Sequence, residues 1–214
     1  MARVLITSGP TRQYLDPVRY LTNASSGRMG RALAGAALAS GHEVVIVSGP
    51  VDVKYPARAE VLSVVSTEEM LEACRRVFPS CDGLIAAAAP CDYRPIQVAP
   101  HKLRKTGGSL RLELAETPDI VATLAKSKGA RWMVAFALET EDKRMRALQK
   151  LERKKCDLIV LNGPGSIHGP GTEVEILAPS GDVVGAFSGP KPEVAEQIVA
   201  VIERILIPRA RATP

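Results

Sequence analysis

The sequence lacks long hydrophobic runs and has few aromatic residues. Phe, Trp and Tyr make up only 4% of its 214 residues, and no apolar stretch approaches the roughly 18 residues needed to span a bilayer. The apolar stretch near the N-terminus meets Gly9 and Pro10 too soon to be the core of a signal peptide. The lack of an apolar run long enough to span a bilayer excludes a membrane protein, and we expect a cytoplasmic one.

The sequence also lacks the patterns of a redox centre, a structural metal site or a catalytic triad. Its 4 cysteines form no Cys-x-x-Cys pair and have no histidine at a metal-binding spacing, which favours ordinary reduced thiols. No Ser-His-Asp or Cys-His arrangement stands out, and His101 and His168 are more typical of surface histidines than of bases. The sequence therefore assigns no metal ligand.

What the chain does contain is typical of a folded globular protein. Hydrophobic residues make up 46% and charged residues 24% of the sequence, which is enough apolar material to bury a sizeable core. We expect a single domain over residues 1–207, followed by a flexible tail over 208–214.

Positive charge is in mild excess and is clustered. The 28 Lys and Arg against 23 Asp and Glu give a net charge of +5. One basic cluster runs from Lys143 to Lys155, and a second comprises Lys102, Arg104 and Lys105. Two basic patches on a globular domain indicate an anionic ligand, either nucleic acid or a small polyphosphate.

Apolar runs typical of buried strands alternate with helical patterns along the chain. Strands are predicted over residues 3–9, 43–49, 61–65, 83–89, 109–114, 132–138 and 156–162, with a hairpin over 174–187 turned at 179–182. Helices are predicted over residues 29–40, 67–77, 118–127 and 192–205, and for the basic cluster after a capping Thr140. The second helix opens with a capping box at 66–69. The pattern predicts an α/β fold: a Rossmann-like open, mostly parallel sheet with helices on both faces, plus a C-terminal antiparallel hairpin.

Four unusual loops each follow a predicted strand. They cover residues 8–28, 90–108, 138–140 and 162–172. Ligands of open parallel sheets bind beyond the carboxyl ends of the strands. We therefore expect these four loops to meet at one edge of the sheet.

The first of these loops leads into a helix through small residues. Ser25, Gly27 and Gly30 lie where free backbone N–H groups and the helix dipole attract phosphate. The spacing is neither a GxGxxG turn nor a P-loop, so glycines serving a turn and close packing are the alternative. Asn23, just before this entrance, suits a site that stabilises an oxyanion, although a turn or capping role is the simpler interpretation.

Charged side chains on the later segments fit a polyphosphate nucleotide. Lys102 lies on a loop that could close over phosphates as a lid, with a solvated surface patch as the alternative. Lys150 and Lys154 share one helix face and repel each other unless an anion lies between them. Asp92 and Asp119 are the best-placed acids for a hydroxyl or a metal, although Asp119 also suits a helix N-terminus.

Six blocks of the sequence, taken in order, resemble a known family. They are residues 7–30 (TSGPTRQYLDPVRYLTNASSGRMG), 86–95 (AAAAPCDYRP), 99–105 (APHKLRK), 116–122 (ETPDIVA), 134–140 (VAFALET) and 149–162 (QKLERKKCDLIVLN). Over roughly residues 4–162 the chain resembles phosphopantothenoylcysteine synthetase, the ligase of coenzyme A biosynthesis. In many bacteria this unit is fused behind a flavin-dependent decarboxylase, and this sequence contains nothing similar to that domain. We therefore expect a stand-alone synthetase or an isolated domain, with a separate decarboxylase as a possible partner.

The resemblance implies a nucleotide-dependent ligation. The substrates would be 4′-phosphopantothenate, L-cysteine and CTP (or ATP), with Mg²⁺ shared among the phosphates. An acyl nucleotidylate would form first, and cysteine would then displace the nucleoside monophosphate. The resemblance also suggests a homodimer, and the lysine-bearing lid with the Lys150/Lys154 pair favours CTP.

The resemblance also implies roles for individual residues. Asn23 and Lys102 would be catalytic, and Arg19 and Asn23 would bind the substrate. Nucleotide contacts would come from Ser25, Gly27, Gly30, Ala86, Ala87, Ala88, Asp92, Lys102, Pro118, Asp119, Ile120, Val121, Phe136, Lys150, Lys154 and Asn162.

The chain departs from the family pattern at three places. Pro90-Cys91 replaces two small apolar residues, Arg104 replaces a lid lysine, and the segment after Asn162 is shorter than usual. These departures concern the nucleotide contacts at that edge and the dimer contact.

Two other functions fit the same pattern less well. An NAD(P)-dependent oxidoreductase on this sheet would need the GxGxxG turn and a Tyr-x-x-x-Lys pair, both of which are missing. A nucleic-acid binder using the basic helix would have few aromatic side chains on which bases could stack. We therefore expect no nucleic-acid partner.

Overall fold

The computed structural model describes residues 1–139, 141–163 and 171–207. Its centre is an eight-stranded sheet in the order β12-β11-β10-β9-β6-β1-β4-β5. The neighbours from β10 to β5 pair in parallel, whereas β11 and β12 pair antiparallel at the other edge. The strands are β1 (Arg3–Ser8), β4 (Glu43–Ser48), β5 (Glu60–Ser63), β6 (Gly83–Ala86), β9 (Trp132–Leu138), β10 (Leu158–Asn162), β11 (Gly171–Leu177) and β12 (Val183–Pro190).

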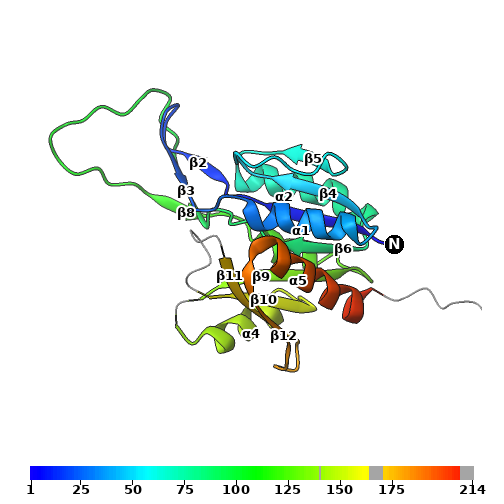
Figure 1. Cartoon of the computed structure of the whole chain (residues 1–214). Coiled ribbons are helices and arrows are strands. Elements are labelled where there is room, and N and C mark those ends of the chain that lie inside the picture. Colours follow the sequence, from blue (N-terminus) through cyan, green and yellow to red (C-terminus); the bar gives the residue numbers. More distant parts are fainter. Residues whose placement is uncertain (140, 164–170, 208–214) are drawn as a thin grey trace, which may run out of the picture.

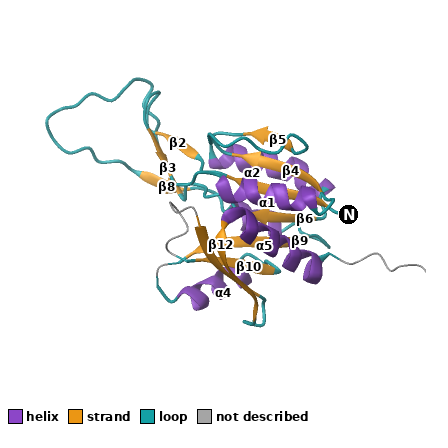
Figure 2. Cartoon of the chain, viewed as in Figure 1, coloured by secondary structure: helices purple, strands orange, loops and turns teal. Residues whose placement is uncertain are grey.

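Helices cover both faces of this sheet (Figure 2). Successive residues of a strand point to opposite faces, so Leu5 belongs to one hydrophobic cluster and Ile6 to the other. The Ile6 face is covered by α1 (Arg28–Ala39) and α5 (Lys191–Leu206), and the Leu5 face by α2 (Thr67–Val77), α3 (Ile120–Ala125) and α4 (Lys143–Arg153). Helices α1 and α5 lie side by side (Figure 1). The predicted fold class is confirmed.

The predicted ends of several elements are also found. Ser66 caps α2 by accepting a hydrogen bond from Glu69 N at 3.1 Å, and the Glu69 carboxylate accepts one from Val65 N at 2.8 Å. Gly41 follows α1 with a φ of +83°, a conformation that side chains disfavour. The C-terminal hairpin turns between Ala178 and Asp182, as predicted.

The predicted strand at 109–114 is wrong. Of these residues only Leu114 lies in a strand, β8 (Leu114–Glu116), which pairs with β7 (Tyr93–Pro95). The alternation that suggested a strand puts Leu110, Leu112 and Leu114 on one face, and all three are exposed. The alternation is present, but no sheet among the described residues packs against that face.

Two predicted helix starts also shift. Helix α3 begins at Ile120 rather than Pro118, because the Asp119 carboxylate caps it by accepting from Ala122 N at 3.0 Å. Helix α4 begins at Lys143 after Asp142, whose φ is +43°. The predicted cap, Thr140, lies outside the described residues, as does the predicted tail at 208–214.

Short strands inside the loops build a projection from the sheet. A hairpin of β2 (Arg12–Tyr14) and β3 (Tyr20–Thr22) packs beside β7. We call this hairpin together with residues 93–116 the arm, and Figure 1 shows it extending away from the body of the molecule. Among the described residues, no helix combines the length and apolar character needed to cross a membrane.

Candidate functional site

The candidate site lies where the chain order of the sheet reverses. From β1 the chain continues through β4 and β5 on one side, whereas β6, β9 and β10 lie on the other. Such a switch point leaves a crevice at the carboxyl ends of the strands. Two adjoining cavities open there, and described residues from each of the four predicted loops line them, as expected. The cavities share four lining residues: Ala88, Pro90, Asp92 and Phe136.

The first cavity, of about 480 Å³, lies at the start of α1, and we call it the α1 cavity. Its lining includes residues 23–30, the ends of β6 and β9, and polar side chains from α4, β10, β11 and α5. Of the predicted site residues it contains Asn23, Ser25, Gly27, Gly30, Ala87, Ala88, Asp92, Phe136, Lys150 and Asn162.

The second cavity, of about 390 Å³, lies at the start of α3, and we call it the α3 cavity. It is lined by the ends of β6 and β9, by the loops before β7 and α3, and by the end of α4. Of the predicted site residues it contains Ala86, Ala88, Asp92, Pro118, Asp119, Ile120, Val121, Phe136 and Lys154.

Two glycines shape the entrance of α1. Gly27 caps the helix with a φ of +73°, and a Cβ on Gly30 would lie 2.1 Å from the Ser8 Oγ, so α1 packs directly against β1. The first intrahelical hydrogen bond runs from Arg31 N to the Gly27 oxygen, which leaves the three preceding amides without helix partners. The glycines therefore serve a turn and close packing, and they also leave backbone donors at the cavity.

Asn23 connects two of the loops. Its side-chain nitrogen donates to the carbonyl oxygens of Ala89 and Pro90, at 3.2 and 2.8 Å. The next residue, Cys91, is held by Thr11, whose Oγ1 accepts from the Cys91 N at 2.8 Å. Burial raises the pKa of the Cys91 thiol, so the family departure at Pro90-Cys91 contributes a buried neutral thiol rather than a reactive one.

Acidic side chains hold the two lysines of the basic helix. Lys150 pairs with the buried Glu139, and Lys154 pairs with Asp119 at 3.1 Å. Burial would raise the pKa of Asp119, but the hydrogen bond from Ala122 N and the charge of Lys154 outweigh it and lower this pKa. The lysines line different cavities. The two carboxylates therefore compensate the repulsion between the lysines, and no anion has to lie between them.

Asp92 lies at the junction of the two cavities. Its carboxylate makes no hydrogen bond or ion pair with the described residues, whereas its backbone oxygen accepts from Thr117 N at 2.9 Å. In the part of the chain that the structure describes, no three His, Cys, Asp or Glu side chains gather to hold a metal. One open carboxylate fits Mg²⁺, which is usually held by one or two carboxylates plus phosphates and water.

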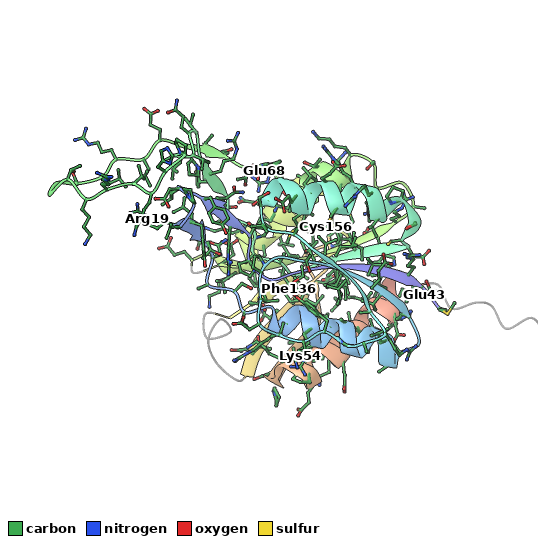
Figure 3. All side chains as sticks on the ribbon, turned by 90° about the horizontal axis from the view of Figure 1, so that it is seen from above. Arg19, Glu43, Lys54, Glu68, Phe136 and Cys156 are labelled. Atoms are coloured by element: carbon green, nitrogen blue, oxygen red, sulfur yellow. The ribbon has the colours of Figure 1, made fainter. Side chains whose placement is uncertain are left out.

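Arg19 and Lys102 lie outside both cavities. The Arg19 guanidinium donates to the Asp16 carboxylate at 2.6 and 2.9 Å and to the Leu103 oxygen at 2.6 Å. Burial opposes ionisation of Asp16, but hydrogen bonds from Val18 N, Leu103 N and Arg19 hold its pKa well below the usual range. Lys102 is exposed on the arm. Figure 3 shows Arg19 at the arm, well apart from Phe136. The structure thus gathers every predicted site residue except these two.

Several polar residues of the α1 cavity were not predicted from the sequence. Arg28, Thr172 and Lys191 line it, and Thr172 and Lys191 are both more than nine-tenths buried. One signal was present in the sequence. Lys191 stands directly before a predicted helix, where a cation opposes the helix dipole and therefore needs an explanation. Thr172 offered no comparable signal.

Comparisons with known proteins agree with the fold. The family model of the DNA/pantothenate metabolism flavoprotein C-terminal domain matches residues 1–206. The crystal structure of the C-terminal domain of Coenzyme A biosynthesis bifunctional protein CoaBC superposes with a TM-score of 0.80 at 36% identity, covering 95% of each chain.

Two relatives extend beyond this chain. The Coenzyme A biosynthesis bifunctional protein CoaBC of Vibrio vulnificus (strain YJ016) is 44% identical over 171 residues, which are 78% of this chain and 42% of that protein. A Cysteine/Cysteine sulfinic acid decarboxylase from an unknown prokaryotic organism is 41% identical over 206 residues, which are 94% of this chain and 57% of that protein. The chain thus spans about half the length of these relatives. It belongs to the family of the DNA/pantothenate metabolism flavoprotein C-terminal domain.

Proposed function

We propose that this chain joins 4′-phosphopantothenate to L-cysteine, using CTP to activate the carboxylate. One observation carries the proposal: residues from five of the six blocks that resemble the synthetase line the two adjoining cavities, and the sixth, 99–105, lies on the arm. The names of the CoaBC relatives, which refer to coenzyme A biosynthesis, support the same conclusion.

The chemistry follows from the poor reactivity of a carboxylate toward an amine. A carboxylate oxygen of phosphopantothenate attacks the α-phosphorus of CTP, and the bond to the β-phosphate oxygen breaks, releasing pyrophosphate. The amine of cysteine then attacks the acyl carbon, CMP leaves, and the nitrogen loses a proton. The protein's contribution is alignment and stabilisation of charge.

The charges that line the two cavities suggest how the nucleotide lies. The α1 cavity presents Arg28, Lys150 and Lys191 against Asp92, whereas the α3 cavity adds Glu116 and Asp119 opposite Arg153 and Lys154. Phosphates suit the cationic cavity, and ribose hydroxyls suit the carboxylates. We therefore place the triphosphate in the α1 cavity, and the ribose and base in the α3 cavity beside the small side chains that end β6.

Asn23 and Asp92 lie between these positions. We propose that Asn23, already oriented by Ala89 and Pro90, holds the acyl nucleotidylate, and that Asp92 would hold Mg²⁺ with the phosphates. When bound, Mg²⁺ neutralises phosphate charge and orients the α-phosphorus.

We further propose a homodimer formed through the arm. Ile96, Val98, Leu110, Leu112 and Leu114 are all exposed there, each by more than 40%, and an exposed apolar surface of this kind is typical of a protein interface. Arg19 and Lys102 lie on the same arm, so closure of the arm or a second subunit would have to bring them to the substrate. We also propose a separate flavin-dependent decarboxylase as a partner, and a cytoplasmic location without nucleic-acid or membrane partners.

Release of pyrophosphate tests this proposal. It should require phosphopantothenate, proceed faster with CTP than with ATP, and increase when cysteine is added. Nucleotide turnover that ignores the carboxylate substrate would contradict the proposal. Carbon dioxide release from cysteine without nucleotide would favour the activity named for the decarboxylase relative. The oxidoreductase alternative is not favoured, and NADPH should give no fluorescence titration.

A further inference from the structure

One wall of the α1 cavity carries polar side chains, and two of them, Thr172 and Lys191, are buried and lie outside the six blocks that resemble the family. Thr172 near the start of β11 is 7% exposed and Lys191 at the start of α5 is 8% exposed. Arg28 at the start of α1 lines the same cavity. The three side chains come from elements far apart in the sequence, so the fold has assembled them.

Among the residues that the structure describes, the Thr172 hydroxyl has no hydrogen-bond partner. Its Oγ1 is buried and bonds to none of the described residues. A buried hydroxyl without a partner is unfavourable, and the cavity is the space that this residue lines. A ligand that enters the cavity can therefore supply the hydrogen-bond partner that the described residues do not provide.

The two cations of this wall favour an anion. Lys191 Nζ donates to the Gly171 oxygen at 3.3 Å. Burial first, and then the positive charge of Arg28, lower the pKa of Lys191. A cation at the first position of a helix also opposes the helix dipole, as does Arg28 at the start of α1. An anion between them would relieve both effects.

The charge of the whole cavity points the same way. Its charged lining residues, among those the structure describes, are Arg28, Lys150, Lys191 and Asp92. The backbone amides at the start of α1 add donors that have no helix partner. A strongly anionic group is thus favoured at the end of the cavity where α1, β11 and α5 begin.

We propose that Arg28, Thr172 and Lys191 form a subsite for the β- and γ-phosphates of the nucleotide, and so for the pyrophosphate that leaves. The inference rests on the proposed function and adds three residues to it. As the bond between the α-phosphorus and the bridging oxygen breaks, the electron pair passes to that oxygen. The two cations and the hydroxyl would then stabilise the charge gained by the departing pyrophosphate.

Binding of inorganic pyrophosphate, measured by calorimetry without phosphopantothenate or cysteine, tests this subsite. Lys191→Met should weaken pyrophosphate binding about tenfold or more, because a charged hydrogen-bond donor is lost. CMP binding should stay within about twofold of the original, because CMP lacks both terminal phosphates. Lys126→Met, an exposed lysine at the end of α3, is the matched control and should change neither.

A second variant covers the case in which Lys191→Met fails to fold. Thr172→Val keeps the shape of the side chain and removes the unpartnered hydroxyl. It should raise the melting temperature or leave it unchanged, yet weaken pyrophosphate binding about three- to tenfold. Thr172→Ser should bind like the original.

Three results would overturn the subsite: no pyrophosphate binding by the original chain, unchanged binding in Lys191→Met and Thr172→Val, or an equal loss for CMP. These results are distinct from failure of the proposed function. If the chain binds pyrophosphate through Lys191 but forms no amide, the proposed subsite is supported and the proposed ligase function is contradicted. If the chain forms the amide but binds pyrophosphate equally well in both variants, the proposed function is supported and the subsite is contradicted.

Discussion

Two glycines of α1 have very different surroundings. A Cβ on Gly30 would lie 2.1 Å from the Ser8 Oγ and 2.5 Å from its Cβ, whereas a Cβ on Gly35 would meet nothing within 4 Å. Gly30→Ala should therefore destabilise the protein by about 1–3 kcal/mol through overpacking, and Gly35→Ala should stabilise it by up to about 1 kcal/mol through helix propensity. Urea unfolding checks both. Equal effects at the two positions would show that α1 does not pack on β1 as described.

Asn23 is the residue on which the second half-reaction is expected to depend. Asn23→Ala should leave pyrophosphate release in the first turnover measurable but slow amide formation by about 10²-fold, because an oriented polar contact to the intermediate is lost. Rapid quench with radiolabelled CTP should show the acyl nucleotidylate accumulating. Amide formation at the original rate would show that Asn23 does not act in the second half-reaction.

Some residue roles could be read from the sequence and others could not. Asn23 stands before a predicted helix, Asp92 follows a predicted strand and Lys150 lies on the basic helix, and the structure brings them to one cavity. Thr172 and Glu139 carry no local pattern, because Thr172 matters through burial at the cavity and Glu139 through its pair with Lys150 on another element. Arg28 stands directly after the small residues that lead into α1 and carries no pattern of its own.

At the scale of elements, the cap of α3 links stability to pH. The folded pKa of Asp119 is lowered from 3.8, so its charge stabilises the protein above the ordinary pKa, and this stability is lost as the pH falls through the lowered value. Asp119→Asn keeps the cap but removes the charge. The variant should be less stable than the original at pH 7, and the two should converge in acid below pH 3.8.

Urea unfolding of both proteins across this range measures the difference. Asp119→Ala is the control for the cap itself and should cost about 1 kcal/mol even in acid. A constant difference between Asp119→Asn and the original at every pH would contradict the role assigned to Lys154.

The long elements were predictable and the short ones were not. Strands such as β1, β4 and β9 are continuous apolar runs buried on both faces, a pattern that survives without tertiary information. The three-residue strands β2, β3, β7 and β8 have no period to detect, since they are extended only because they pair with one another. Residues 109–114 were wrongly predicted as a strand for a related reason, because their alternating pattern does not reveal whether a neighbouring strand is available to pair with them.

At the scale of the whole molecule, the arm is the feature that the isolated chain leaves unexplained. Leu110 and Leu112 are 60% and 41% exposed. Replacing both with Glu should convert the proposed dimer to a monomer, because burying two charges against an apolar partner costs several kcal/mol. Sedimentation velocity measures the change. Replacing Val183, which is 41% exposed in the C-terminal hairpin, is the matched control and should leave the dimer intact.

A dimer that persists in the Leu110/Leu112 variant would place the interface elsewhere. A monomer with full ligase activity would show instead that Lys102 reaches the substrate by closure of its own arm. Loss of dimer and activity together would assign both to the same surface.

The central claim is that the carboxylate of phosphopantothenate is activated when one of its oxygens attacks the α-phosphorus of the nucleotide. Phosphopantothenate labelled with oxygen-18 in its carboxylate tests it most directly, with the products analysed by mass spectrometry after ligation to cysteine. We predict one labelled oxygen in the phosphate of CMP and none in pyrophosphate. Label in inorganic phosphate, or CMP free of label while the amide forms, would contradict the account.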